Sequence, residues 1–218
     1  MTDPVETWAI VVAGGTGTRF GGPKQFAELE GRPLLSWSLE AARQACAHVV
    51  AVVPGTEIEG GPQRWDADVV VAGGATRSDS VRAGLAAVPE SAEVIVVHDA
   101  ARPLAGSEVW AAVISEVAAG ADGAVPAFPV SDTIRKKTPD GRSKTLDRTD
   151  LFAVQTPQAF KASVLKSAHA GGGDATDDSA LVEALGGRVV LVPGTPHNLK
   201  VTTPSDLLVA AALARSTL

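Results

Sequence analysis

Residues 11–24 read VVAGGTGTRFGGPK, an apolar stretch that leads into a glycine-rich loop and then meets two cations. Gly14, Gly15 and Gly17 leave backbone N–H groups bare, so that an anion can approach them without interference from Cβ atoms. The loop follows a Val/Ile-rich run at 8–13 that predicts a buried strand. Because ligands of parallel α/β sheets bind beyond the carboxyl ends of strands, the loop predicts an anion site.

The loop does not match the two commonest phosphate-binding motifs. Thr18 and Phe20 follow Gly17 without the third glycine of a dinucleotide fingerprint, and no lysine completes the pattern GxxxxGK[ST]. Instead, Arg19 lies within the loop and Lys24 follows it. A guanidinium fork and a compact ammonium suit the phosphates of a nucleoside triphosphate. The alternative is a glycine-rich turn with two solvated cations.

Further apolar runs recur along the chain, and they are continuous, as expected of strands that are covered on both faces. With the first run, the predicted strands are residues 8–13, 48–53, 68–72, 93–98, 123–128 and 188–192. Helical patterns lie at residues 34–45, 78–88, 107–120 and 205–216. The alternation predicts an α/β fold with a mainly parallel, twisted sheet and helices on both faces.

The pattern breaks at residues 131–150, SDTIRKKTPDGRSKTLDRTD, which are polar and contain the turn signal PDG. Because both flanks could pair, the stretch predicts a projecting β-hairpin arm, with a floppy loop as the alternative. Such an arm is marginally stable alone and needs a partner surface. We therefore expect residues 1–218 to form one domain with an arm at about 131–150.

Composition excludes several classes of protein. The net charge of −6 argues against a general nucleic-acid binder, which needs an excess of cations, but not against a local cationic pocket. The only cysteine, Cys46, excludes an intrachain disulfide and is expected to be a buried structural thiol. No apolar run reaches the ~18 residues of a membrane span, and the N-terminus does not resemble a signal peptide. We therefore expect a soluble cytoplasmic protein that binds neither nucleic acid nor membranes.

Two further loops follow predicted strands. The sequence AGGATRSDS at 72–80 again bares the backbone, and its serines could cap the next helix, so it could be a helix cap or a ligand loop. In VVHDAARP at 96–103, Asp99 ends a buried strand, where a carboxylate can hold a magnesium ion directly or through water. The alternative is that Asp99 caps a turn and that His98 is a satisfied buried histidine.

Taken together, several segments resemble the cytidylyltransferases that act on 2-C-methyl-D-erythritol 4-phosphate in the non-mevalonate isoprenoid pathway. The matching pieces are AGGTGTRFGGPKQF, GGATRSDSV, VVHDAARP, PVSDTI, LDRTDLFAVQTPQAF, ATDDSALVEALG and HNLKVTTPSDL, which extend from about residue 8 to 213. The resemblance implies a Rossmann-like nucleotidyltransferase fold. It also implies that CTP and methylerythritol phosphate give 4-diphosphocytidyl-2-C-methyl-D-erythritol and pyrophosphate, with Mg²⁺ or another divalent cation.

The resemblance further implies roles for individual residues. The catalytic residues would be Arg19, Lys24, Arg148 and Lys200. The CTP-binding residues would be Ala13, Gly14, Gly15, Gly17, Gly74, Ala75, Ser80, Asp99 and Ala100. The acceptor-binding residues would be Asp99, Arg102, Thr133, Arg148, Thr156, Thr176 and Lys200, with Asp99 also a metal ligand, directly or through water. Thr133 and Arg148 lie on the arm, which implies a homodimer in which each arm completes the neighbouring site.

The chain departs from the family pattern at two places. The family often has PAAG where this chain has VAGG, and often has an acidic residue where this chain has Ala75. Small residues remain at both places, so contacts through the backbone are still expected, whereas a side-chain contact at residue 75 is not.

Three other functions stay open at this point. A cytidylyltransferase for an alditol phosphate such as ribitol 5-phosphate would share the fold and most motifs, because the sequence does not reveal the shape of the acceptor. A guanylyltransferase for the molybdenum cofactor has a similar glycine loop, but HDAARP and the arm disfavour it. A non-catalytic nucleotide-binding regulator would need the pocket but not the four cationic side chains of Arg19, Lys24, Arg148 and Lys200.

Overall fold

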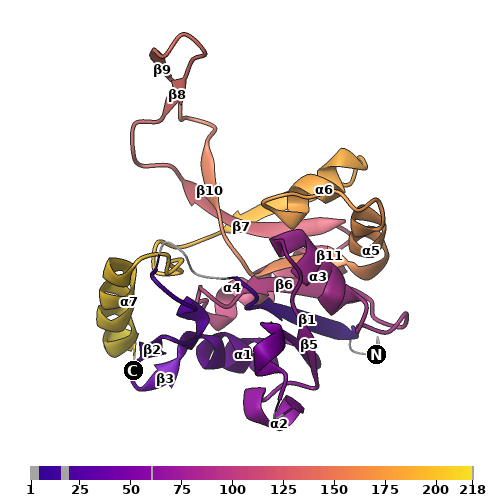
Figure 1. Cartoon of the computed structure of the whole chain (residues 1–218). Helices are drawn as coiled ribbons and strands as arrows, with labels where there is room; N and C mark the ends of the chain where they lie inside the picture. Colours follow the sequence, from indigo (N-terminus) through magenta and orange to yellow (C-terminus); the bar gives the residue numbers. More distant parts are fainter. Residues whose placement is uncertain (1–4, 16–19, 60, 218) are drawn as a thin grey trace.

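The structure, a computed structural model, describes residues 5–15, 20–59 and 61–217 (Figure 1). The strands are β1 (Thr7–Val12), β2 (Glu28–Leu29), β3 (Arg32–Pro33), β4 (His48–Val53), β5 (Val69–Ala72), β6 (Val94–Asp99), β7 (Gly123–Pro129), β8 (Arg135–Lys137), β9 (Ser143–Thr145), β10 (Phe152–Val154), β11 (Gln158–Lys161) and β12 (Val189–Pro193). The helices are α1 (Leu34–Ala45), α2 (Gly61–Trp65), α3 (Arg77–Leu85), α4 (Ser107–Ala118), α5 (Ala162–Ala170), α6 (Asp178–Ala184) and α7 (Pro204–Thr217), with 3-10 helices η1 (Lys24–Phe26) and η2 (Gly55–Glu57). Every predicted strand and helix is present, with ends that shift by only a few residues. None of the described helices is both long and apolar enough to cross a membrane.

The parallel part of the central sheet contains β6, β1, β4 and β5, which lie side by side in that order. The chain runs from β1 through β4 to β5 and then returns to the other side of β1 as β6. At the carboxyl end of β1, Val12 pairs with Asp99 of β6 and with Val52 of β4. The order in which the parallel strands are added to the sheet therefore reverses beside β1. Such a reversal is a topological switch point, where open α/β sheets bind their ligands.

The other half of the sheet is mixed. β11 lies antiparallel between β6 and β7, β10 continues antiparallel along β7, and β12 pairs with the opposite edge of β7 in parallel. The sequence did not predict β10 and β11, which are short and include a glutamine, Gln158, that is fully buried. Gln158 is tolerated there because its Nε2 donates to the Gln155 carbonyl and to Asp177.

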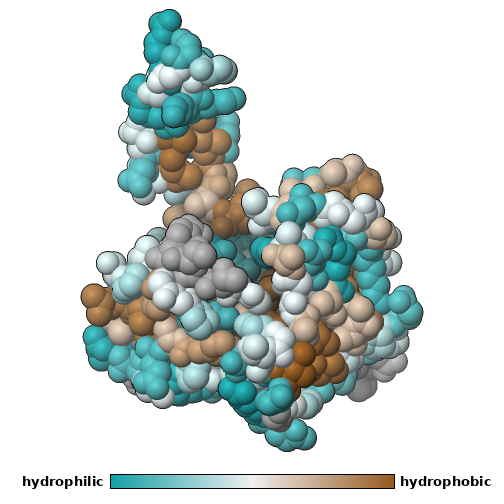
Figure 2. All heavy atoms as spheres, viewed as in Figure 1, coloured by the Kyte–Doolittle hydropathy of each residue, from teal (hydrophilic) through white to brown (hydrophobic). Residues whose placement is uncertain are grey.

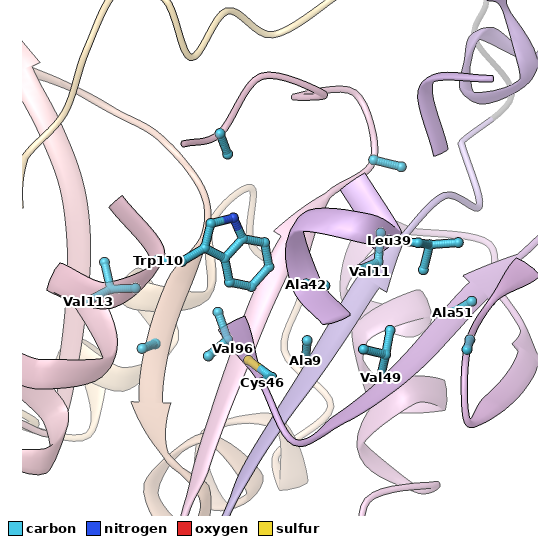
Figure 3. Packing of buried hydrophobic residues seen from close by; sticks show 14 of the residues in the cluster. Ala9, Val11, Leu39, Ala42, Cys46, Val49, Ala51, Val96, Trp110 and Val113 are labelled. Carbon is cyan, nitrogen blue, oxygen red and sulfur yellow. The ribbon is translucent and has the colours of Figure 1, made fainter. Parts of the chain in front are cut away.

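Helices cover both faces of the sheet, as predicted. On one face, Leu39 of α1 and Trp110 of α4 pack in the same cluster as Ala9 and Val11 of β1 (Figure 3). On the other face, the side chain of Ile10 points the opposite way and belongs to a second cluster, which residues of α3, α5 and α6 complete. Both faces of β1 are therefore buried, which explains its continuous apolar run.

Cys46 packs in the first of these clusters, next to the end of α1 (Figure 3). Burial raises the pKa of its thiol to about 12, although a hydrogen bond with Thr7 opposes the shift. The prediction of a buried thiol is confirmed.

A third cluster holds the chain that leads into α7. Val201 is fully buried with Leu29 and Leu34, and α7 packs on the same cluster. The Val201 N–H donates to the Ala101 carbonyl at 2.8 Å. This contact fixes the segment that carries Lys200 beside the end of β6.

The predicted arm is present as β8 and β9, which form a separate two-stranded ribbon that projects from the body (Figure 1). Thr138 N–H donates to the Arg142 carbonyl at the tip, and Gly141 adopts φ +81° in the turn. The tip is hydrophilic, whereas hydrophobic side chains gather toward the base of the arm (Figure 2). The hairpin prediction is therefore confirmed, and the floppy-loop alternative is not needed.

One detail of the predicted α3 is wrong. The helix begins at Arg77, and its cap is Thr76 rather than Ser78 or Ser80. The Thr76 side chain accepts from the Asp79 N–H while Asp79 accepts from the Thr76 N–H, which is a capping box. The two serines are buried instead, because they lie on the side of α3 that faces the protein.

Candidate functional site

A cavity of about 490 Å³ opens at the carboxyl ends of β1 and β6, at the switch point of the sheet. Its walls come from the loop after β1, the loop between β5 and α3, the end of β6 and the segment before α7. The lining residues are Val12, Ala13, Gly14, Gly15, Lys24, Gln25, Gly74, Ala75, Thr76, Arg77, Ser80, Asp99, Ala100, Ala101 and Lys200. Most of the residues predicted from the sequence to bind CTP therefore line one cavity.

A larger cavity of about 630 Å³ lies between α1, α4 and α7. The described residues that line it are mostly apolar, and Glu40 is the charged one among them. Because a triphosphate needs cations, this cavity does not suit the predicted ligand. The chemistry selects the smaller cavity.

The glycine-lined wall is held by contacts within the protein. Gly74 N–H donates to Ser80 Oγ at 3.2 Å, and Ala13 N–H donates to the Val52 carbonyl at 2.8 Å. A Cβ on Gly74 would lie 2.2 Å from Asp79 Cβ, so glycine is required there for packing. A Cβ on Gly15 would meet none of the described residues within 4 Å.

Asp99 is the centre of the charged groups in this cavity. Lys200 Nζ lies 2.5 Å from Asp99 Oδ2, and Arg77 Nε lies 3.3 Å from Asp99 Oδ1. Burial alone would raise the pKa of Asp99, but the charges of Arg77 and Lys200 outweigh it and hold that pKa well below its ordinary value. Asp99 therefore stays ionised and fixes two cations at the wall of the cavity.

Arg77 was not predicted as a site residue. Besides Asp99, its guanidinium pairs with the buried Asp178, at 2.7 Å. Burial disfavours the charge of Arg77, yet the two carboxylates raise its pKa above the ordinary value. No local signal in the sequence points to Arg77, because its partners Asp99 and Asp178 lie 22 and 101 residues away in the chain.

Lys24 and Gln25 join the glycine loop to the segment that carries Lys200. Lys24 Nζ donates to the Val201 carbonyl at 2.9 Å. Gln25, which is buried and was also not predicted, donates from Nε2 to the Gly15 carbonyl at 3.2 Å. The loop and both lysines are thus linked even before a ligand binds.

The other predicted residues lie elsewhere. Thr156 is buried beneath Asp99, where its hydroxyl accepts the Asp99 N–H at 3.0 Å, and Arg102 lies in the turn after β6. Thr176 is exposed in the segment before α6. Gly17 and Arg19 lie outside the described residues.

Thr133 and Arg148 belong to the arm, which projects from the body (Figure 1), and neither lines the cavity of its own chain. Both are exposed, and Arg148 donates to the Ser131 carbonyl across the base of the hairpin. These two residues are not brought to the cavity within one chain.

His98 is fully buried, and both of its ring nitrogens have hydrogen-bond partners, Arg102 and Thr156. This agrees with the alternative given above, in which His98 is a satisfied buried histidine. Burial lowers the pKa of His98 to about 4, against the opposing effect of Asp99. The ring stacks at an angle on Trp110, with 4.9 Å between the ring centroids. His98 is therefore neutral near pH 7 and provides no charge to the site.

Comparison with known proteins agrees with the geometry. The family model for IspD, 2-C-methyl-D-erythritol 4-phosphate cytidylyltransferase, matches residues 7–216. A protein of that name from Frankia casuarinae is 44% identical over 212 residues, covering 94% of this chain and 80% of the relative. Another from Rhodococcus jostii is 43% identical over 212 residues, covering 94% of this chain and 93% of the relative.

A solved structure supports the same assignment. The crystal structure of 2-C-methyl-D-erythritol 4-phosphate cytidylyltransferase from Thermus thermophilus superposes with a TM-score of 0.80 at 36% identity, covering 94% of this chain and 98% of that one. The chain therefore belongs to the 2-C-methyl-D-erythritol 4-phosphate cytidylyltransferase family and is a CTP-dependent nucleotidyltransferase that makes 4-diphosphocytidyl-2-C-methyl-D-erythritol in isoprenoid biosynthesis.

Proposed function

We propose that the cavity beyond β1 and β6 is where the enzyme transfers the cytidylyl group of CTP to methylerythritol phosphate. The observation that carries this proposal is the charge of its lining. Three cations, Lys24, Arg77 and Lys200, accompany one carboxylate, Asp99, among the described lining residues. Such an excess of positive charge suits a triphosphate and a second phosphate ester.

The cytosine would lie against the glycine-lined wall. The N–H groups of Ala13 and Gly74 are already bonded within the protein. These residues would therefore contact the base through their carbonyl oxygens and their small surfaces. Carbonyl oxygens are the acceptors that the amino group of cytosine needs.

The triphosphate would extend toward Lys24 and Lys200, joined by Arg19 of the glycine loop. The phosphate of methylerythritol phosphate attacks the α-phosphorus of CTP, and pyrophosphate leaves. With a second pKa of about 6, this phosphate is ionised near neutral pH, so the reaction needs no general base. The obstacle is repulsion between polyanions, about 4 kcal/mol for unit charges ~4 Å apart at an effective dielectric of ~20. The fixed cations would offset this repulsion and position the phosphates in line.

A divalent cation fits this site as a partner of the substrate rather than as a resident group. The described residues contain no cluster of three or more histidine, cysteine or acidic side chains that could hold a metal. They offer the carboxylate of Asp99, and Mg²⁺ is commonly held by one or two carboxylates together with substrate phosphates. When bound, the ion would neutralise charge on the phosphates, and Lys200 or Arg77 would release an oxygen of Asp99 to it.

The arm would complete the site of a second copy of the chain. Phe152 and Val154 of β10, next to the arm, leave 44% and 39% of their surfaces exposed. An exposed apolar strand beside a hairpin that is marginal alone favours a homodimer with arm exchange. Thr133 and Arg148 would then bind the acceptor phosphate in the neighbouring subunit, while Thr176 would help line the acceptor site. The cytoplasmic location and the single-domain organisation stay predictions from the sequence.

Two variants distinguish the two cavities. Ala75 is exposed and lines the smaller cavity, whereas Ala41 lines the larger one. In Ala75→Phe the new ring would occupy the proposed cytosine site, so we expect the KM for CTP to rise about tenfold or more, as for a loss of 1.4 kcal/mol. Ala41→Phe should leave the KM for CTP unchanged. The opposite pattern, measured by pyrophosphate release, would place CTP in the larger cavity.

A further inference from the structure

Beneath the cavity, four residues from three segments are joined in a closed ring of hydrogen bonds. His98 Nε2 lies 3.1 Å from the Arg102 carbonyl oxygen, and His98 Nδ1 lies 3.1 Å from the Thr156 hydroxyl. Asn198 Nδ2 donates to the Thr156 carbonyl at 2.9 Å. Arg102 Nη1 donates to the Asn198 carbonyl at 2.8 Å, which closes the ring. His98 and Asn198 are completely buried.

The direction of each hydrogen bond in this ring follows from the donors and acceptors. A carbonyl oxygen can only accept, so His98 carries its hydrogen on Nε2 and accepts the Thr156 hydroxyl hydrogen at Nδ1. The same hydroxyl oxygen accepts the Asp99 N–H at 3.0 Å. The backbone of Asp99 is therefore held by a neutral imidazole through one threonine.

The ring joins segments that carry residues of the proposed site. His98 directly precedes Asp99 at the end of β6, and Arg102 lies in the turn that follows. Asn198 precedes Lys200 by two residues. Above the ring, the side chains of Asp99 and Lys200 meet at 2.5 Å. Together with the hydrogen bond from the Val201 N–H to the Ala101 carbonyl, the ring thus holds β6 and the segment before α7 at the point where their charged groups line the cavity.

We propose that this ring positions Asp99 and Lys200, which line the cavity, for the acceptor phosphate, with His98 and Asn198 as positioning residues that touch no substrate. The inference rests on the function proposed above. The glycine-lined wall is held separately, by the Gly74–Ser80 hydrogen bond and by the capping box of α3. Loss of the ring should displace Lys200, which faces both the triphosphate and the acceptor, but leave the contacts with the cytosine in place, so it should impair the acceptor and the chemical step more than the binding of CTP.

A break in the ring has a physical cost at two places. Without the imidazole, the Thr156 hydroxyl and the Arg102 carbonyl lose partners in a buried environment, and the segments shift to recover them. A misplacement of ~1 Å in a site of this kind costs about 10²-fold in rate. Because the ring is closed, a break at either His98 or Asn198 should release the same constraint.

The test uses His98→Phe, Asn198→Leu and the double variant. Phenylalanine keeps a ring against Trp110 but makes neither hydrogen bond, and leucine keeps the volume of Asn198 without its donor. We expect each single variant to lower kcat/KM for methylerythritol phosphate by about 10–10²-fold, by the misplacement estimate, while the Kd of CTP measured by calorimetry stays near the wild-type value. The double variant should be hardly worse than the poorer single variant, since coupled residues are not additive.

Trp110→Phe is the matched control. Trp110 packs on the His98 ring but takes no part in the ring of hydrogen bonds. The Trp110→Phe variant should unfold at a lower temperature but keep the wild-type kcat/KM for the acceptor. It therefore separates loss of packing from loss of positioning. If His98→Phe does not fold, Asn198→Leu carries the test with the same expected split.

Three results would overturn the proposal. They are wild-type kcat/KM in the folded single variants, an equal loss of CTP binding, or a double variant whose loss is the product of the single losses. An inactive wild-type protein would instead contradict the proposed function. The two failures can therefore be told apart in one set of measurements.

Discussion

Lys200 allows a controlled test of the cations in the cavity, because the chain contains a closely matched lysine elsewhere. Lys200 pairs with Asp99 at 2.5 Å and leaves 40% of its side chain exposed. Lys161 pairs with Asp122 at 2.9 Å and leaves 39% exposed, but it lies outside the residues that line the cavity. Lys200→Met and Lys161→Met therefore remove the same charge from two lysines that are equally exposed and are both paired with an aspartate.

The expected effect on turnover follows from the charges. Lys200→Met leaves two of the three lining cations, Lys24 and Arg77. Loss of one preorganised electrostatic donor costs about 10²–10³ in kcat. This loss corresponds to about 2.7–4 kcal/mol of transition-state stabilisation. It is close to the Coulomb energy of ~4 kcal/mol between unit charges ~4 Å apart at an effective dielectric of ~20. Stability should fall little, because partly exposed ion pairs contribute about 0–1 kcal/mol and Asp99 keeps Arg77 as a partner.

The assay is magnesium-dependent pyrophosphate release from CTP and methylerythritol phosphate, with urea unfolding as the check on folding. We expect Lys200→Met to lose about 10²–10³ in kcat and Lys161→Met to match the wild type. Equal kcat in the two folded variants would refute the claim that the Lys200 charge acts on the reaction.

Four further predictions follow from other contacts in the molecule. Asp206 accepts the N–H groups of Thr202 and Thr203 at the start of α7, so Asp206→Ala should lower the free energy of unfolding by about 0.5–2 kcal/mol in urea, with kcat unchanged. Hydrogen bonds, mainly from the Thr202 side chain, lower the pKa of Asp206 to about 2; this stability is therefore present above the ordinary value of 3.8 and is lost as pH falls toward 2, which acid titration in urea would show. Cys46 should react with a thiol reagent only at the rate of unfolding, and fast labelling of the native protein would contradict its burial. Mixed dimers of Arg148→Ala and Arg19→Ala should regain activity, and no recovery after proven subunit exchange would exclude a site shared between subunits.

The parallel part of the fold could be predicted because its signals are local. The strands β1, β4 and β6 are buried on both faces, so each appears in the sequence as a continuous apolar run. The glycine loop follows β1 directly and Asp99 ends β6, and neighbouring parallel strands bring their carboxyl ends together.

The missed features depend on partners far away in the chain. Gln158 is tolerated inside β11 because its Nε2 donates to Asp177, from the segment before α6, as well as to the Gln155 carbonyl. Arg77 meets Asp99 and Asp178, which are 22 and 101 residues distant. No periodicity or local composition reveals such contacts, because they arise only when the sheet brings the segments together.

The cap of α3 was missed for a different reason. Thr76, Ser78 and Ser80 are all residue types that favour the cap, and the sequence alone gives little to choose between them. The reciprocal hydrogen bonds between Thr76 and Asp79 decide the choice, because each side chain accepts the backbone N–H of the other residue.

The most direct test of the central claim is a measurement of magnesium-dependent pyrophosphate release for the four nucleoside triphosphates, each with methylerythritol phosphate or ribitol 5-phosphate. We predict release only from CTP with methylerythritol phosphate. Release from CTP with ribitol 5-phosphate alone would contradict the assigned acceptor while leaving the roles of the cations intact. No release from folded protein that binds CTP would contradict catalysis itself.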